Sequence, residues 1–262
     1  MKNNKWYEKL FLIFVFIFLY LPIIFMIFYS FSESRIIGHW SGFSLQWYEK
    51  LLTNTQMQRS FFFTIFIAVA ATIISTIIGV FSAIGLYFSK KNIQNTLLSI
   101  NQIPIVSPDI ILGISTMLLF LLFNLRFGWI TVLIAHTMFC TPIVIVQIMP
   151  KLKAMNTDLI AAANDLGANT WQMLRHAVFP SIKPGIISGA LMAFTFSLDD
   201  FVVTYFTAGE GVSTLSIQIY SSIKRATPEL NALSTVMFLL IIIIIIVYWF
   251  VTKNNKLETK VF

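Results

Sequence analysis

Residues 158–180 read DLIAAANDLGANTWQMLRHAVFP, a polar and weakly amphipathic run within a chain that is otherwise strongly apolar. Leu159, Ala163 and Leu166 would share one face of a short helix. Gly167 would end that helix, because glycine readily adopts the left-handed backbone needed just past a helix end. The run is too short and too polar to cross a bilayer. We therefore predict a surface segment in which a helix is followed by a glycine elbow and a second helix.

The second helix of this segment has its own start and stop signals. Thr170 is a predicted N-cap, Trp171 and Leu174 lie on one side, and Pro180 and Pro184 are expected to end the helix. Physical chemistry alone leaves two interpretations equally open. The segment either docks onto a partner protein, or only anchors the loop in the lipid headgroups as an interfacial amphipathic helix.

The composition outside this segment is that of an integral membrane protein. The 262 residues are 57% hydrophobic and 11% charged, and the mean hydropathy is +0.82. A soluble domain carries about 25% charged residues. The single cysteine excludes an internal disulfide framework. No phosphate-binding GxxxxGK[ST] loop occurs, and no nucleophile, base and orienting residue recur together, so we predict a protein that is not an enzyme.

Six apolar runs approach or exceed the roughly 20 residues that cross a bilayer core. We predict an all-α protein with a single transmembrane domain over residues 1–262 and six spanning helices, at about residues 10–31, 60–88, 100–123, 128–149, 185–207 and 232–251. Twelve of the 18 Lys and Arg residues then fall on one side, which favours cytoplasmic N- and C-termini and a cytoplasmic loop over residues 150–183. The net charge of +7 fits an anionic inner leaflet better than a nucleic acid.

The run AAANDLGANTWQMLRHAVFP resembles the cytoplasmic loop of ABC importer permeases, whose pattern is Glu-Ala-Ala, a glycine four residues later, and a closing Leu-Pro. Ala162, Ala163, Gly167 and Pro180 match that pattern. Ala161 stands where the family has glutamate, and a phenylalanine precedes the proline. The resemblance implies that residues 158–180, the coupling segment, dock onto an ATPase subunit. The implied docking residues are Asp158, Ala162, Ala163, Asp165, Leu166, Gly167, Trp171, Leu174 and Pro180.

The resemblance extends to the runs IPIVSPDIILGISTMLLF, HTMFCTPIVIV and FTFSLDDFVVTYFTAG, which are similar to the spermidine/putrescine branch of these permeases. It implies a type I ABC importer permease fold in a bacterial cytoplasmic membrane, with polyamines as the cargo. It also implies three protein partners: a second homologous permease, a pair of ATPase subunits and an external substrate-binding protein. ATP and Mg²⁺ would bind to the partner ATPase, and no cofactor is expected in this chain.

Two adjacent carboxylates interrupt the fifth apolar run, at Asp199 and Asp200. An ionised side chain within a membrane segment costs a few kcal/mol at least and usually faces a cavity or a partner. We therefore predict that one of them meets a substrate ammonium group, with Phe201 and Tyr205 offering aromatic faces to the cation. The alternative is a structural role, in which both aspartates cap a helix break. Asp109, after Pro108, is predicted to start a helix rather than to bind a ligand.

Other patterns carry less specific information. His136 and Cys140 are four residues apart, but two ligands do not make a zinc site, so we predict no bound metal. Two pairs of small residues at i, i+4 spacing favour close helix contacts, either within the chain or with a second subunit: Ser75 with Gly79, and Gly185 with Gly189. Two other functions remain possible: an ABC permease for a different small solute, or a stand-alone secondary transporter.

Overall fold

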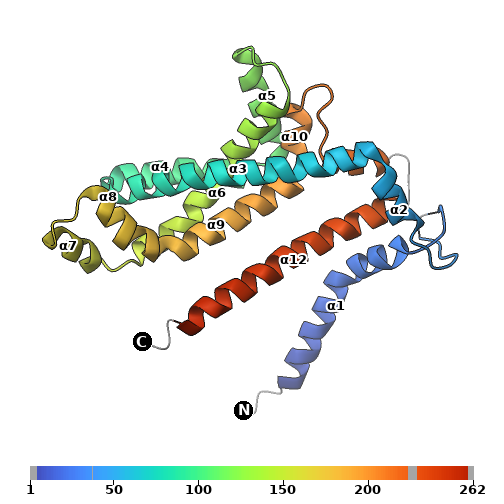
Figure 1. Cartoon of the computed structure of the whole chain (residues 1–262), viewed down its shortest axis with the longest axis horizontal. Helices are drawn as coiled ribbons and strands as arrows, with labels where there is room; N and C mark the ends of the chain where they lie inside the picture. The colour runs from blue at the N-terminus through green and yellow to red at the C-terminus, as the bar shows by residue number, and fades with distance from the viewer. Residues whose placement is uncertain (1–4, 37, 224–228, 259–262) are drawn as a thin grey trace. The chain divides into compact units, whose positions relative to one another are not determined.

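The computed structural model describes residues 5–36, 38–223 and 229–258, and these contain helices and no extended strand (Figure 1). The all-α prediction is confirmed. The chain divides into two compact units, residues 1–58 with 219–262, and residues 59–218. The prediction of one domain over the whole chain is not tested by this division, because two units can belong to one transmembrane domain.

The described part of the first unit holds three whole helices, the first residues of α3 (Thr55–Phe88), the end of α11 (Leu215–Ile223) and a connecting loop. Its helices are α1 (Lys5–Ser30), α2 (Gln46–Thr53) and α12 (Glu229–Glu258), and α12 contacts both of the others. Trp47 on α2 is buried, and its indole N–H donates to the Ser32 carbonyl over 2.7 Å. The Lys50 ammonium lies 4.5 Å from the centre of the Trp47 ring and 3.9 Å from a Glu229 carboxylate oxygen. These contacts fix α2 against the loop and the start of α12.

The second unit contains the remaining helices. They are α3 (Thr55–Phe88, from residue 59), α4 (Lys91–Val106), α5 (Asp109–Leu122), α6 (Trp129–Lys153), α7 (Asp158–Asp165), α8 (Thr170–Met173), the π-helical turn η1 (Leu174–Val178), α9 (Phe179–Asp199), α10 (Val202–Thr207) and the start of α11 (Leu215–Ile223). The most extensive pairing joins α6 to α9. Val144, Ile148 and Leu152 of α6 form the fully buried centre of the core.

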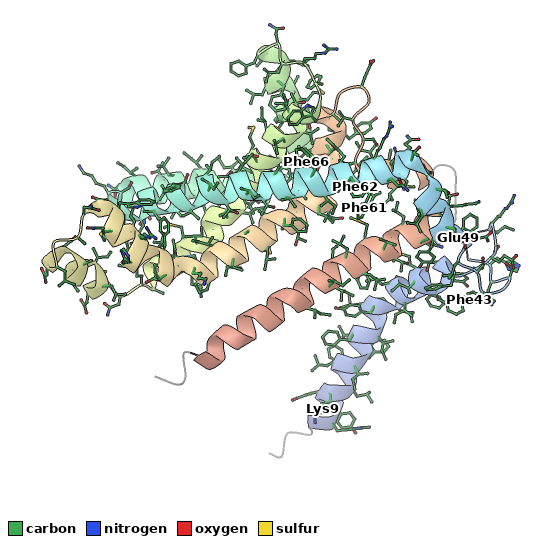
Figure 2. The ribbon with its side chains drawn as sticks, viewed as in Figure 1. Lys9, Phe43, Glu49, Phe61, Phe62 and Phe66 are labelled. Carbon is green, nitrogen blue, oxygen red and sulfur yellow. The ribbon has the colours of Figure 1, made fainter. Side chains whose placement is uncertain are left out.

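Apolar side chains cover the outside of these helices as well as the core. Phe62 and Phe66 on α3, for example, have 69% and 51% of their surface exposed (Figure 2). A helix that is apolar all round is typical of a segment in contact with lipid. Among the described residues, four helices are long and apolar enough to span a membrane, or five if α4 and α5 together form one broken span. The predicted six spans and the cytoplasmic termini therefore stay predictions.

Two of the predicted spans are not single helices. The run over 100–123 is interrupted at Ser107 and Pro108, and α4 and α5 meet there at 106°. The residue before a proline avoids the α region, and Ser107 is extended, with φ −69° and ψ 140°. The run over 185–207 starts earlier, at Phe179, and breaks after Asp199, where Asp200 is extended with φ −62° and ψ 128°. Each break places a carboxylate at a helix end.

Candidate functional site

A pocket of about 370 Å³ lies where these two breaks meet. Its walls come from the end of α4, the start of α5, the middle of α6 and the α9–α10 break. The volume falls in the range of about 300–1,000 Å³ that is usual for small-ligand sites. Three carboxylates line it, those of Asp109, Asp199 and Asp200. No Lys or Arg is among the described residues of its lining.

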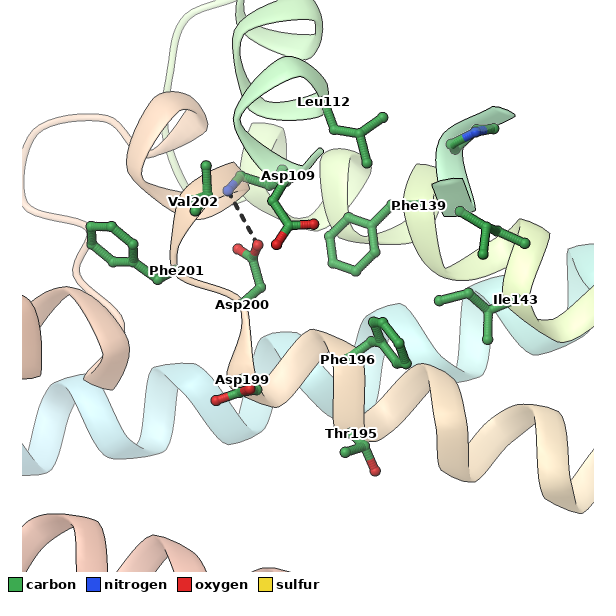
Figure 3. Close-up of a pocket in the computed structure, with 13 residues that line it drawn as sticks. Asp109, Leu112, Phe139, Ile143, Thr195, Phe196, Asp199, Asp200, Phe201 and Val202 are labelled. Carbon is green, nitrogen blue, oxygen red and sulfur yellow. Dashed lines mark hydrogen bonds between the residues drawn. The ribbon is translucent and has the colours of Figure 1, made fainter. Parts of the chain in front are cut away.

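Figure 3 shows the Asp109 and Asp200 carboxylates pointing toward one another, while that of Asp199 points in a different direction from the last residue of α9. Asp109 and Asp199 are exposed, whereas the Asp200 side chain is largely covered, with 9% of its surface exposed. Two facing carboxylates repel each other in a medium of low dielectric constant, so a cation between them is stabilising. This geometry therefore favours a positively charged ligand.

The Asp200 side chain also has a structural role. Its Oδ1 accepts from the Val203 N–H over 3.1 Å, and its Oδ2 accepts from the Thr204 N–H over 2.8 Å. These are the free N–H groups at the start of α10, so Asp200 acts as an N-terminal cap. The two predicted roles of the aspartates, meeting a cation and capping a helix break, do not exclude one another. Asp200 both caps the break and lines the pocket, and Asp199 has no part in the cap.

Aromatic rings line part of the pocket, but not all are the predicted ones. Phe139, Phe196 and Phe201 belong to the lining. Of the two predicted aromatic residues, Phe201 lies there and Tyr205 does not. Tyr205 is one helical turn further on, with its ring centre 5.6 Å from that of Phe201. Sequence reasoning missed Phe139 and Phe196, because a chain with 26 phenylalanines gives no signal that separates a pocket phenylalanine from one facing lipid.

Asp109 lines the pocket although the sequence predicted only a structural role for it. It does start a helix, as predicted, since it is the first residue of α5. The same break that makes it a first residue also turns its side chain into the pocket. A signal for this second role is present in the sequence as Ser-Pro-Asp in the middle of an apolar run. A proline at that position favours a helix break. The charged residue after it then lies beside any cavity that the break creates.

The coupling segment has the predicted helix, elbow and helix. Gly167 has φ +75°, and its N–H donates to the Asn164 carbonyl over 2.9 Å while the Ala168 N–H donates to the Ala163 carbonyl over 3.0 Å. This pair of bonds is the Schellman motif that satisfies the last carbonyls of a helix. Leu166 projects into solvent beside the elbow, with 88% of its surface exposed. The helix–elbow arrangement thus presents an apolar residue with no partner in the described part of the chain.

Two details of the second helix differ from prediction. The N-cap is Asn169 rather than Thr170, because the Asn169 side chain accepts from the Gln172 N–H and the Gln172 side chain accepts from the Asn169 N–H. Pro180 does not end the helix either. A proline has no N–H to continue the α pattern, and the preceding turn widens to the π form, in which the Phe179 N–H bonds to the Leu174 carbonyl.

The consequence is one continuous helical segment from Thr170 to Asp199, through α8, η1 and α9. Its 30 residues span roughly 45 Å at about 1.5 Å per residue. Pro184 lies within it and does not interrupt it. The coupling segment and the aspartate pocket therefore lie at opposite ends of the same continuous helical segment. The remaining docking residues are exposed or half-buried, namely Asp158, Ala162, Ala163, Asp165, Trp171, Leu174 and Pro180.

Comparison with known proteins identifies a family and relatives that match this chain. The model for the binding-protein-dependent transport system inner membrane component family matches residues 75–256. The spermidine/putrescine transport system permease protein PotC of Haemophilus influenzae is 35% identical, over 94% of this chain and 96% of its own. The putrescine transport system permease protein PotI of Escherichia coli is 36% identical, over 85% of this chain and 82% of its own.

A solved structure supports the fold. The chain is similar, with a TM-score of 0.69 and 18% identity, to a chain of a bacterial ABC transporter involved in the import of the acidic polysaccharide alginate, and the match covers 97% of this chain and 98% of that one. At this identity the likeness concerns the fold and not the cargo. With the family model matching well over half of its length, the chain belongs to the family of binding-protein-dependent transport system inner membrane components, the permeases of ABC importers.

Proposed function

We propose that this permease imports polyamines and that Asp109, Asp199 and Asp200 line the path of the cation. The three carboxylates in one pocket carry this proposal. A polyamine is a chain of ammonium groups separated by methylenes. The pocket offers carboxylates to the charges and the rings of Phe139, Phe196 and Phe201 to both charges and methylenes. An anionic cargo would be repelled here. The names of the PotC and PotI relatives agree with this choice.

The partners are part of the proposal. We infer that a second permease completes the translocation path, that two ATPase subunits bind ATP and Mg²⁺ and dock onto the coupling segment, and that an external binding protein delivers the substrate. ATP-driven closure of the ATPase pair would move the coupling segment. Because α8, η1 and α9 are continuous, that movement would reach the pocket along one helix and open it to alternate sides of the membrane.

Uptake of labelled spermidine by cells carrying the full transporter tests the cargo and the carboxylates together. Asp109→Asn and Asp199→Asn are each expected to raise the KM for uptake about tenfold, the effect of losing one hydrogen bond to a charged group. Asp200→Asn removes the charge but keeps one side-chain oxygen that can accept from the N–H groups at the start of α10, so the complex should assemble with a similarly raised KM. Glu210→Gln, an exposed carboxylate beyond α10, is the matched control and should stay within twofold.

Co-purification of all subunits shows that each variant assembles. Native KM values for all three aspartate variants would remove the carboxylates from the path and leave the cargo assignment intact. No spermidine or putrescine uptake by the native complex would overturn the polyamine proposal and leave a family member with another cargo.

The glycine elbow gives a second prediction. A β-carbon at Gly167 meets nothing within 4 Å, so a substitution there is opposed by its backbone angle alone. Gly167→Val places a β-branched residue in the left-handed region at a cost of about 1–2 kcal/mol. We expect the elbow to open and the ratio of polyamine imported to ATP hydrolysed to fall severalfold in proteoliposomes.

Asparagine tolerates the left-handed conformation, so Gly167→Asn should keep more than half of the native ratio. Equal ratios for the valine variant and the native chain would show that coupling does not depend on the elbow geometry.

A further inference from the structure

A buried histidine joins the three elements that meet behind the aspartate pocket. His136 lies on α6 with 1% of its surface exposed. Its Nδ1 is 2.7 Å from the Ser197 hydroxyl oxygen on α9, and its Nε2 is 2.9 Å from the Thr204 hydroxyl oxygen on α10. The same Nε2 is 3.4 Å from an Asp200 carboxylate oxygen. His136 does not line the pocket itself.

The direction of two of these hydrogen bonds follows from Thr204. Its hydroxyl lies 2.7 Å from Asp200 Oδ2, and a carboxylate oxygen can only accept, so the Thr204 hydrogen is donated there. Thr204 Oγ1 must then accept from His136, which assigns a hydrogen to Nε2. The other ring nitrogen, Nδ1, is hydrogen-bonded to the Ser197 hydroxyl. Ser197, His136, Thr204 and Asp200 thus form one hydrogen-bonded chain, and hydrogen bonds in such a chain strengthen one another.

This chain spans the point where the path must change shape. α9 ends at Asp199 and α10 begins at Val202, so only two residues connect them. The α6 side is well supported, because the Thr131 hydroxyl near its start donates to the Thr207 carbonyl at the end of α10 over 2.8 Å. His136 thus ties the end of α9 to a fixed neighbour through Ser197, and its second bond is to Thr204, the residue that also holds the Asp200 carboxylate.

We propose that His136 is a positioning residue of the importer, which holds the α9–α10 break and thereby presents the Asp200 carboxylate to the cationic substrate. The charge of the substrate in this proposal rests on the proposed function. The role of His136 in holding the α9–α10 break does not. A buried residue serving only as packing would be replaceable by an apolar side chain of similar size. A positioning residue would not, because the break would lose its tether while the fold remained.

Two measurements separate these roles in the complete complex. The first is the KM and maximal rate of spermidine uptake in proteoliposomes. The second reports on the break directly and needs no substrate: the mobility of a nitroxide attached at Phe201→Cys. The sole cysteine of this chain, Cys140, is buried and is first replaced by alanine, and the permease is labelled before the complex is reconstituted with its partners, so that only the new cysteine carries the label.

His136→Leu is expected to raise the KM about tenfold, to leave the maximal rate within twofold, and to increase the mobile fraction of the label. Thr204→Val should do the same. His136→Gln keeps a side-chain N–H donor and should restore most of the native KM. Thr207→Val is the matched control, because Thr207 is equally buried on α10 and its hydroxyl bonds only to the Val203 carbonyl of its own helix, over 2.7 Å. It should behave as the native chain.

An unchanged label spectrum in an assembled His136→Leu complex would overturn the proposal, and so would an unchanged KM. A fall in maximal rate with native KM would assign His136 to folding or assembly and equally overturn it. If the native complex imports no polyamine, the cargo proposal fails and the label spectra alone decide whether His136 holds the break.

Discussion

Replacing Leu166 with aspartate is expected to abolish co-purification of the ATPase subunits with this permease, a loss of about a hundredfold or more in affinity. Leu166 projects from the elbow with 88% of its surface exposed. Residues that dominate an interface are central anchors that fill a pocket on the partner, and losing one costs 2 kcal/mol or more. Aspartate adds a second penalty, because a carboxylate buried against an apolar groove has lost its hydration.

The permease itself should tolerate this change, since Leu166 is covered by nothing in its own unit. Leu52→Asp is the matched control, with the same substitution at a residue that is 75% exposed. Leu52 is on α2, which the Lys and Arg distribution predicts to lie on the opposite side of the membrane. The control should retain the ATPase. Retention of the ATPase by Leu166→Asp as well would remove Leu166 from the interface, and the docking surface would then have to centre on Trp171 or Leu159.

The membrane character and the coupling segment could be predicted because their signals are local. An apolar run of 20 residues has only one way to satisfy its backbone in lipid. The elbow needs a single glycine with a positive φ, and Gly167 was recognisable from its place after an amphipathic turn. The errors in this segment are also local. Asn169 and Thr170 are both good N-cap residues, and only the reciprocal bonds with Gln172 decide between them.

The pocket could not be predicted in full, because its walls come from four places in the chain. Asp199 and Asp200 stood out as charges in an apolar run. Asp109 stood at a predicted helix start, where a carboxylate already has an ordinary explanation. Its second role depends on the 106° bend between α4 and α5, a tertiary feature. The sequence suggests only Cys140, on the same helix, as a neighbour of His136. The hydrogen-bond partners of His136 are Ser197 and Thr204, which are 61 and 68 residues away in the chain.

The packing of the small-residue pairs likewise depends on tertiary contacts. The sequence left open whether they pack within the chain or against another subunit. A β-carbon at Gly79 would lie 2.6 Å from Val144 Cγ1 and 2.8 Å from Val144 Cβ, and one at Gly189 would lie 3.2 Å from Val144 Cα. Both glycines therefore pack internally, against one valine of α6 that is fully buried. Helices in lipid associate through such close contacts.

Gly79→Leu is accordingly expected to prevent folding, and Gly79→Ala to destabilise the permease by about 1–3 kcal/mol, the usual cost of overpacking. Val144 cannot retreat from a new methyl group, because Gly189 of α9 lies behind it. Gly85→Ala is the matched control on the same helix, since a β-carbon there meets nothing within 4 Å. Thermal unfolding of the purified chain in detergent should show a lower midpoint temperature for Gly79→Ala than for the native chain. The midpoint of Gly85→Ala should equal that of the native chain.

The cause can be isolated by adding Val144→Ala to Gly79→Ala. If the clash with Val144 is the source of the loss, the double variant should be more stable than the sum of the two single changes predicts, because the shortened side chain makes room for the methyl group. Additive losses would mean that Gly79 is needed for a different reason, such as the close approach of its backbone to a second permease, and the contact with α6 would then be only a part of its role.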